Sequence, residues 1–125
     1  MRQEISNWWR QAKKDLEVAE KNYEFKEYYA CAFFSQQAVE KSLKALILTQ
    51  TKQKVEGHSL VYLGKTAKVP ENYLSNLKKL SPQYFLARYP DASEDVPFDL
   101  YDQKITLEFL ETAREVLKWI EKQLE

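Results

Sequence analysis

Residues 27–49 read EYYACAFFSQQAVEKSLKALILT, and this stretch decides the fold. On a helical wheel its apolar side chains cover most directions: Ala30, Phe33, Phe34, Ala38, Leu43, Ala45, Leu46, Ile47 and Leu48. A helix that is apolar nearly all round is surrounded by protein. Its uncharged part, Tyr28 to Val39, is shorter than the roughly 20 residues of a membrane span. The stretch therefore predicts a central helix, from about Glu27 to Thr49, with other helices packed around it.

Two amphipathic stretches at the ends of the chain can cover this central helix. In the first, from about Glu4 to Glu24, apolar residues recur at steps of three and four: Ile5, Trp8, Trp9, Ala12, Leu16, Ala19 and Tyr23. The last, from about Asp99 to Glu125, carries a similar stripe: Phe109, Leu110, Ala113, Val116, Leu117, Ile120 and Leu124. One apolar stripe on each helix is typical of packing against a shared core.

The segment between the long helices predicts short ones. A helix is expected over Leu60 to Ala67 and another after Pro70, through Leu80. Ser81 and Pro82 are expected to restart the chain as N-cap and first helical residue, with a loop over Pro90 to Pro97. The predicted fold is all-α: an antiparallel up-and-down bundle of four to five helices, three long and one or two short. Its 125 residues suit a single domain over residues 1–125.

Composition excludes several classes of protein. The chain has 2 glycines, which rules out glycine-rich phosphate loops of the P-loop and dinucleotide-binding kinds. Its 19 basic and 19 acidic residues cancel, whereas a general nucleic-acid coat is clearly basic. Cys31 is the sole cysteine and His58 the sole histidine, too few for a usual zinc site, and we expect no metal or other cofactor. The polar N-terminus and the lack of disulfides favour the cytoplasm and no membrane association.

Polar residues interrupt the central helix on one face. Gln37, Lys41 and Lys44 share that face with Phe34, and a buried charge is costly unless it is paired. These residues either line a pocket for an anion or pair with carboxylates of the same chain, for which the candidates are Asp15, Glu40 and Asp102.

A second group of polar residues precedes the last helix, in the turn Arg88-Tyr89-Pro90-Asp91. We expect Asp102 to point inward from the first turn of that helix. The planar guanidinium of Arg88 suits Asp91, Asp102 or a ligand phosphate, and helix N-termini also attract anions. The alternative is a loop clamp formed by Arg88 and Asp91. His58 is expected to cap or orient the helix that follows it.

Three stretches together resemble the HEPN domain, the higher eukaryotes and prokaryotes nucleotide-binding domain. They are FFSQQAVEKSLKAL (33–46), GHSL (57–60) and ARYPD (87–91). The resemblance extends over nearly the whole chain. It implies an antiparallel bundle of four or five helices that is commonly dimeric. It also implies a minimal nucleotidyltransferase as partner, sometimes in a toxin–antitoxin pair.

Active members of the family are ribonucleases that need no metal and use an arginine followed, after four to six residues, by a histidine. After Arg88 the corresponding positions hold Ser93, Glu94 and Asp95. Before His58 the arginine would stand at 51–53, which hold other residues. The sequence thus argues against RNA cleavage by the family mechanism, and we assign no catalytic residue.

Three hypotheses follow for the function. The first is a noncatalytic, dimeric HEPN-like module that associates with a nucleotidyltransferase and holds a nucleotide or RNA phosphate. Its candidate ligand-binding residues are Gln37, Lys41, Lys44, Arg88, Asp91 and Asp102. The second is a ribonuclease, or toxin, with an altered active site in which Arg88 stabilises the transition-state phosphate. The third is a purely structural helical dimer.

Overall fold

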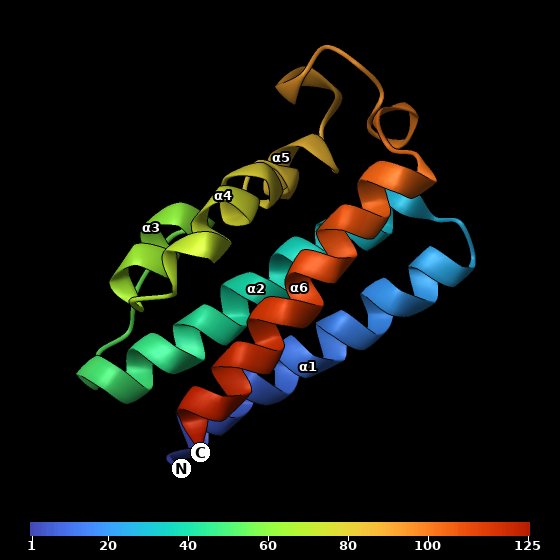
Figure 1. The fold of residues 1–125 in the computed structure, drawn as a ribbon. Coiled ribbons are helices and arrows are strands. Elements are labelled where there is room, and N and C mark those ends of the chain that lie inside the picture. Colours follow the sequence, from blue (N-terminus) through green and yellow to red (C-terminus); the bar gives the residue numbers. More distant parts are fainter.

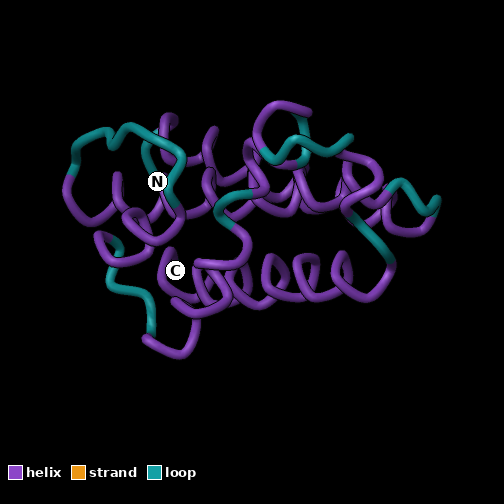
Figure 2. The backbone as a smooth tube through the Cα atoms, turned by 90° about the horizontal axis from the view of Figure 1, so that it is seen from above, coloured by secondary structure: helices purple, strands orange, loops and turns teal.

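The computed structural model describes residues 1–125, and all its regular structure is helical, without strands (Figure 2). Its α-helices are α1 (Gln3–Glu24), α2 (Tyr28–Thr51), α3 (Leu60–Thr66), α4 (Glu71–Leu80), α5 (Gln83–Leu86) and α6 (Gln103–Leu124). Between α5 and α6 lie two 3-10 turns, η1 (Pro90–Ala92) and η2 (Pro97–Leu100). Five helices have seven residues or more, and α5 is a single turn. The predicted all-α bundle with three long helices is confirmed.

The three long helices lie side by side, with α3, α4 and α5 placed along α2 (Figure 1). Both chain termini lie at the same end of the bundle (Figure 1). The opposite end carries the α1–α2 turn and the segment from η1 to η2. None of the helices is both long and apolar enough to cross a membrane.

Helix α2 is the central helix that its sequence predicts, and α1, α3, α4, α5 and α6 all contact it. Fourteen of its residues are buried, from Cys31 to Leu48. The Cys31 thiol is fully buried, and this burial raises its pKa to about 11. A thiol held in its neutral form behaves as a small apolar group, so Cys31 belongs to the packing of the bundle.

The stripes of α1 and α6 face α2, as the spacing of their apolar residues predicts. In α1 the buried residues include Ile5, Ala12 and Ala19, and in α6 they include Ala113 and Ile120. The alanines at positions 12, 19 and 113 let the helix axes come close together. The core is therefore built where the three long helices meet.

Two expected helix boundaries in the segment between residues 80 and 103 are wrong. Ser81 is not an N-cap of α5: it has helical dihedral angles, and its Oγ accepts a hydrogen bond of 3.0 Å from the backbone N–H of Leu60. The Ser81 hydroxyl thus accepts from an N–H group in the first turn of α3 that has no partner within the helix. The last helix begins at Gln103 instead of Asp99, because Pro97 opens the 3-10 turn η2 and Asp102 has extended dihedral angles.

This later start changes the role of Asp102. As N-cap of α6, its Oδ1 accepts a hydrogen bond of 2.9 Å from the backbone N–H of Ile105. Its side chain is exposed, so the expected inward orientation is wrong. A carboxylate at this position stabilises the helix through the unpaired N–H groups of the first turn.

Candidate functional site

Lys41 is neutralised by a carboxylate of α1. Its Nζ donates a hydrogen bond to Oδ2 of Asp15 at a distance of 2.5 Å, and Gln11 Nε2 donates to Oδ1 of the same carboxylate at 2.9 Å. The side chain of Asp15 is 4% exposed and that of Lys41 is 21% exposed. Burial and this ion pair together join α1 to α2.

Lys44 is neutralised within α2 itself. Its Nζ lies 3.1 Å from Oε2 of Glu40, and both side chains are buried. Glu40 also accepts a hydrogen bond of 3.3 Å from Gln36 Nε2, and Nδ1 of His58 lies 3.0 Å from its Oε1. One buried carboxylate thus holds a lysine, an amide and an imidazole.

Gln37 extends this network towards the surface. Its Nε2 donates a hydrogen bond of 2.8 Å to Oε1 of Gln36, whose own Nε2 donates to the backbone oxygen of His58 at 3.2 Å. His58 does not cap α3, because Ser59 does so by accepting from Tyr62 N–H. It fixes the segment before α3 to α2, which is the orienting role that we expected.

Arg88 is the one predicted basic residue without a carboxylate partner. Its Cζ lies 4.9, 4.2 and 4.8 Å from the ring centroids of Phe33, Tyr84 and Tyr89, which we call the Arg88 cage. Its Nε donates a hydrogen bond of 2.8 Å to the backbone oxygen of Tyr84. The four terminal N–H groups have no acceptor in the protein. The guanidinium is therefore fixed in place, and its terminal N–H groups are free to donate hydrogen bonds to a ligand.

Tyr84 also brings His58 close to Arg88. The rings of His58 and Tyr84 are stacked, with centroids 3.9 Å apart and an interplanar angle of 14°. Cζ of Arg88 lies 4.2 Å from the same Tyr84 centroid, so the imidazole and the guanidinium both contact one ring. The sequence places these residues far apart, and the fold brings both to one aromatic ring.

The predicted ligand residues therefore fall into separate groups. Lys41 and Lys44 are paired with carboxylates, Gln37 belongs to the network around Glu40, and Asp102 caps α6. Asp91 is exposed in η1 and forms no hydrogen bond or ion pair. Arg88 contacts neither Asp91 nor Asp102 through an ion pair, so the alternative of a loop clamp formed by Arg88 and Asp91 is absent.

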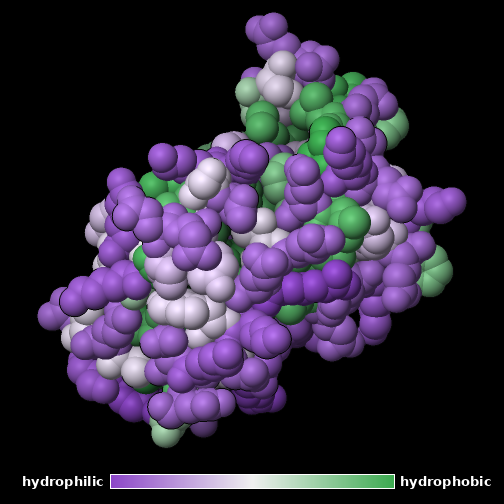
Figure 3. Space-filling model, viewed as in Figure 1, coloured by the Kyte–Doolittle hydropathy of each residue, from purple (hydrophilic) through white to green (hydrophobic).

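An open hollow lies beside α5. It has a volume of about 730 Å³, and we call it the α5 hollow; it is lined by Pro82, Phe85, Leu86, Tyr89, Asp91 and Ala92. The side chains of Phe85 and Tyr89 are large and remain 54% and 46% exposed. Figure 3 shows hydrophobic residues gathered at this end of the molecule, over α5 and the segment that follows it.

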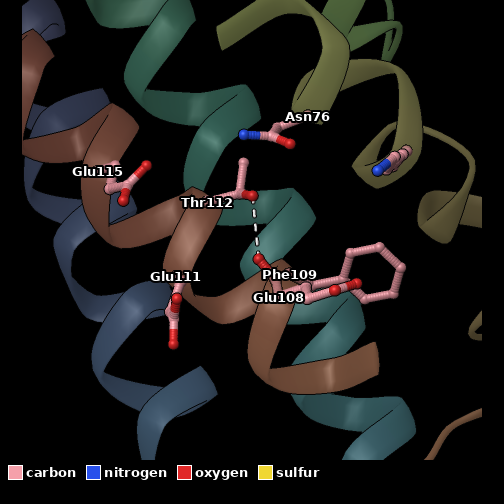
Figure 4. A pocket seen from close by; sticks show the side chains of 7 residues that line it. Asn76, Glu108, Phe109, Glu111, Thr112 and Glu115 are labelled. Atoms are coloured by element: carbon pink, nitrogen blue, oxygen red, sulfur yellow. Dashed lines mark hydrogen bonds between the residues drawn. The ribbon is translucent and has the colours of Figure 1, made fainter. Parts of the chain in front are cut away.

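A smaller hollow of about 200 Å³ lies between α4 and α6 (Figure 4). Its wall on α6 carries three glutamates, Glu108, Glu111 and Glu115, while α4 contributes Asn76 and Lys79. It shares no residue with the Arg88 cage or the α5 hollow. Its acidic lining makes it unsuitable for an anion, and we do not assign it to the functional site.

Sequence reasoning missed the residues that hold Arg88. Tyr84 and Arg88 are four positions apart, a spacing that places side chains on one side of a helical turn. That spacing was a usable signal for their contact. The contact of Phe33 with Arg88 could not be predicted, because it depends on how α5 packs against α2.

Comparisons with known proteins show which family shares this fold. The model of the HEPN domain matches residues 5–123. The crystal structure of TT1696 from Thermus thermophilus is similar, with a TM-score of 0.89 and 30% identity over 98% of this chain and 99% of that one. The structure of ST0689, an archaeal HEPN homologue, has a TM-score of 0.83 and 30% identity over 100% of both chains.

A HEPN domain protein from Thermotoga maritima, TM0613, also has this fold, with a TM-score of 0.73 and 25% identity over 94% of this chain and 97% of that one. Among curated protein sequences none matches. The family model covers nearly the whole chain, and the similar structures share its complete helical arrangement. The chain belongs to the HEPN domain family.

Proposed function

We propose that the protein is a cytoplasmic HEPN binding module that holds the phosphate of a nucleotide through Arg88. The observation that carries this proposal is the state of Arg88: its guanidinium is oriented by three aromatic rings and one backbone oxygen, and no carboxylate neutralises it. A planar fork of N–H donors matches two phosphate oxygens. Orienting the side chain before binding lowers the entropy that the complex must lose.

Lys41 and Lys44 play a supporting role in this proposal. Because Asp15 and Glu40 already neutralise them, a phosphate at either lysine would have to displace a buried ion pair. Both lysines stabilise the bundle through these ion pairs. We therefore assign direct phosphate contact to Arg88 alone.

The test is isothermal titration of the purified protein with 5′-mononucleotides and with inorganic phosphate. Arg88→Gln is expected to weaken nucleotide binding at least about tenfold, since hydrogen bonds to a charged group contribute about 1.5–3 kcal/mol. The matched control is Arg114→Gln, because Arg114 is exposed and already paired with Glu20. Equal affinity in all three proteins, or no binding of any nucleotide, would contradict the proposal.

The resemblance to HEPN proteins further supports a homodimer that associates with a minimal nucleotidyltransferase. Light scattering during gel filtration measures the mass of the particle, which is expected at twice that of the chain. Mixing with a nucleotidyltransferase encoded beside this protein is expected to give a larger, co-eluting particle. Separate elution of the two proteins would contradict the partnership.

RNA cleavage is the second candidate function, and the contact of His58 with Glu40 and Tyr84 favours it. Glu40 accepts a hydrogen bond from Nδ1–H, which leaves Nε2 to take the proton of a ribose 2′-hydroxyl. The 2′-oxygen would then attack the phosphorus while Arg88 stabilises the phosphate charge. The P–O5′ bond would break, the 5′-oxygen would take a proton from the imidazolium, and a 2′,3′-cyclic phosphate would remain.

Incubating RNA with the wild type, His58→Asn and Arg88→Gln separates this candidate from simple binding. Cleavage that is lost in both variants would support the ribonuclease. Cleavage that is equal in all three proteins, or absent from all, removes it and leaves the binding module.

A further inference from the structure

We infer that the α5 hollow is a nucleobase subsite that selects guanine through Asp91. This inference rests on the proposed function, because it takes the nucleotide phosphate to lie at Arg88. It adds the chemical identity of the base and the residues that recognise it.

The walls of the hollow suit a flat aromatic ring. Phe85 and Tyr89 line it and are about half exposed, and Pro82, Leu86 and Ala92 complete an otherwise apolar lining. Phe85 is held by Tyr84, whose ring meets it edge to face at a centroid distance of 4.8 Å. Bases stack on exposed aromatic side chains of this kind, and the gain is about 1–3 kcal/mol per base.

Asp91 supplies the polar group that such a subsite needs. It is exposed in η1, it lines the hollow, and no donor in the protein contacts it. A carboxylate only accepts hydrogen bonds, and its two oxygens can accept a parallel pair. Guanine presents two adjacent donors, N1–H and the 2-amino group. Adenine and cytosine present one donor beside an acceptor, and uracil places carbonyl oxygens on both sides of its N3–H.

Tyr89 connects this subsite with the phosphate site. Its ring lines the α5 hollow, and the same ring lies 4.8 Å from Cζ of Arg88. A base stacked in the hollow therefore contacts Tyr89, and the ring of Tyr89 also contacts the guanidinium of Arg88, to which we assign the phosphate. A nucleotide has a planar base that carries hydrogen-bond donors and a phosphate anion, and a single sugar joins the two.

A second copy of the chain fits the hollow less well. An apolar surface pressed against it would bury the Asp91 carboxylate with no new partner, and it would bring no anion to the Arg88 guanidinium, which lies outside the lining of the hollow. Burial of such unpaired charges is costly. A nucleotide satisfies both groups at once, by donors on its base and oxygens on its phosphate.

The test is titration with GMP, IMP, AMP and UMP, of the wild type and three variants: Asp91→Asn, Phe85→Ser and Asp95→Asn. The wild type is expected to bind GMP about tenfold more tightly than AMP, with UMP weakest. IMP lacks the 2-amino group and is expected between GMP and AMP. Asp91→Asn should remove the preference for GMP over IMP and leave AMP binding unchanged. Asp95→Asn, an exposed carboxylate nearby in sequence, should change nothing.

Phe85→Ser is expected to weaken all four nucleotides and to leave inorganic phosphate unaffected. If the wild type and Asp91→Asn bind all four nucleotides alike, while Arg88→Gln still weakens them, the guanine subsite is wrong and the phosphate site stands. If no nucleotide binds the wild type, the proposed function itself fails. If Phe85→Ser converts a dimer into monomers with unchanged nucleotide affinity, a second copy covers the hollow and the inference is overturned.

Discussion

Glu40 of α2 holds His58 of the segment before α3, with Nδ1 3.0 Å from Oε1 and 3.2 Å from Oε2. The carboxylate is buried within the bundle, whereas the side chain of His58 is 44% exposed. His58 thus connects the buried carboxylate of Glu40 with the surface beside Tyr84 and Arg88. The same carboxylate pairs with Lys44, so stability and site geometry depend on one residue.

Glu40→Gln is expected to destabilise the protein by about 3 kcal/mol, because it leaves the buried Lys44 without its counter-charge. Urea unfolding measures the change. The double variant Glu40→Gln with Lys44→Met is expected to recover most of the loss, since the unpaired charge is then gone. A double variant as unstable as Glu40→Gln alone would show that the ion pair is not the cause.

Lys41→Met is expected to cost about 2 kcal/mol, because Asp15 keeps a buried charge with Gln11 as its remaining partner. Removing both charges, in Asp15→Leu with Lys41→Met, is expected to restore a stability close to that of the wild type. Thermal unfolding of the single and double variants measures the coupling between the two residues. Additive effects would mean that the two side chains do not act as a pair.

Gly64→Ala is expected to destabilise the contact between α3 and α4 by about 1–3 kcal/mol. A Cβ at this position would lie 2.7 Å from Cδ1 of the buried Leu77 and 3.3 Å from Cγ2 of Val69. Leu77→Ala in the same background should relieve the clash, so that the double variant loses less than the sum of the two single losses. Wild-type stability in Gly64→Ala would show that α4 shifts freely.

Cys31 predicts how stability depends on alkaline pH. Burial raises the pKa of its thiol in the folded protein to about 11, from an ordinary value of 9.0. The folded state therefore holds the proton more tightly than the unfolded state. The resulting stability is fully present below pH 9 and is lost as the pH rises through about 11. Cys31→Ala should lose stability less steeply than the wild type over this range, and an identical profile would exclude the thiol as a cause.

The long helices could be predicted from the sequence because α1 and α6 each carry an apolar stripe at helical spacing, while α2 is apolar on nearly all sides. The segment around Ser81 and Asp102 could not, since its geometry depends on tertiary contacts. Ser81 is held by an N–H group 21 positions away, and Pro97 forms a 3-10 turn that delays α6. Local capping preferences alone favoured the wrong helix for Ser81, and the expected start of α6 at about Asp99 was too early.

The candidate site was predictable in its residue types and not in its pairing. The lysines of α2 were expected to need partners, with Asp15 and Glu40 among the candidates. The partner of Lys41 required the position of α1, whereas Lys44 pairs with Glu40 within α2 itself. The link between His58 and Arg88 is the clearest example: the spacing of Tyr84 and Arg88 indicates their contact, but nothing in the sequence indicates that His58 stacks on the same ring.

The central position of α2 also has a consequence for the order in which the protein folds. Helices α1 and α2 are joined by only residues 25–27, so closing their contact costs little chain entropy, whereas α6 must return across about fifty residues. We expect the α1–α2 hairpin to form in the folding transition state and α6 to dock afterwards. Stopped-flow measurements on Ala12→Gly and Ala113→Gly test this, since the first should slow folding and the second should speed unfolding.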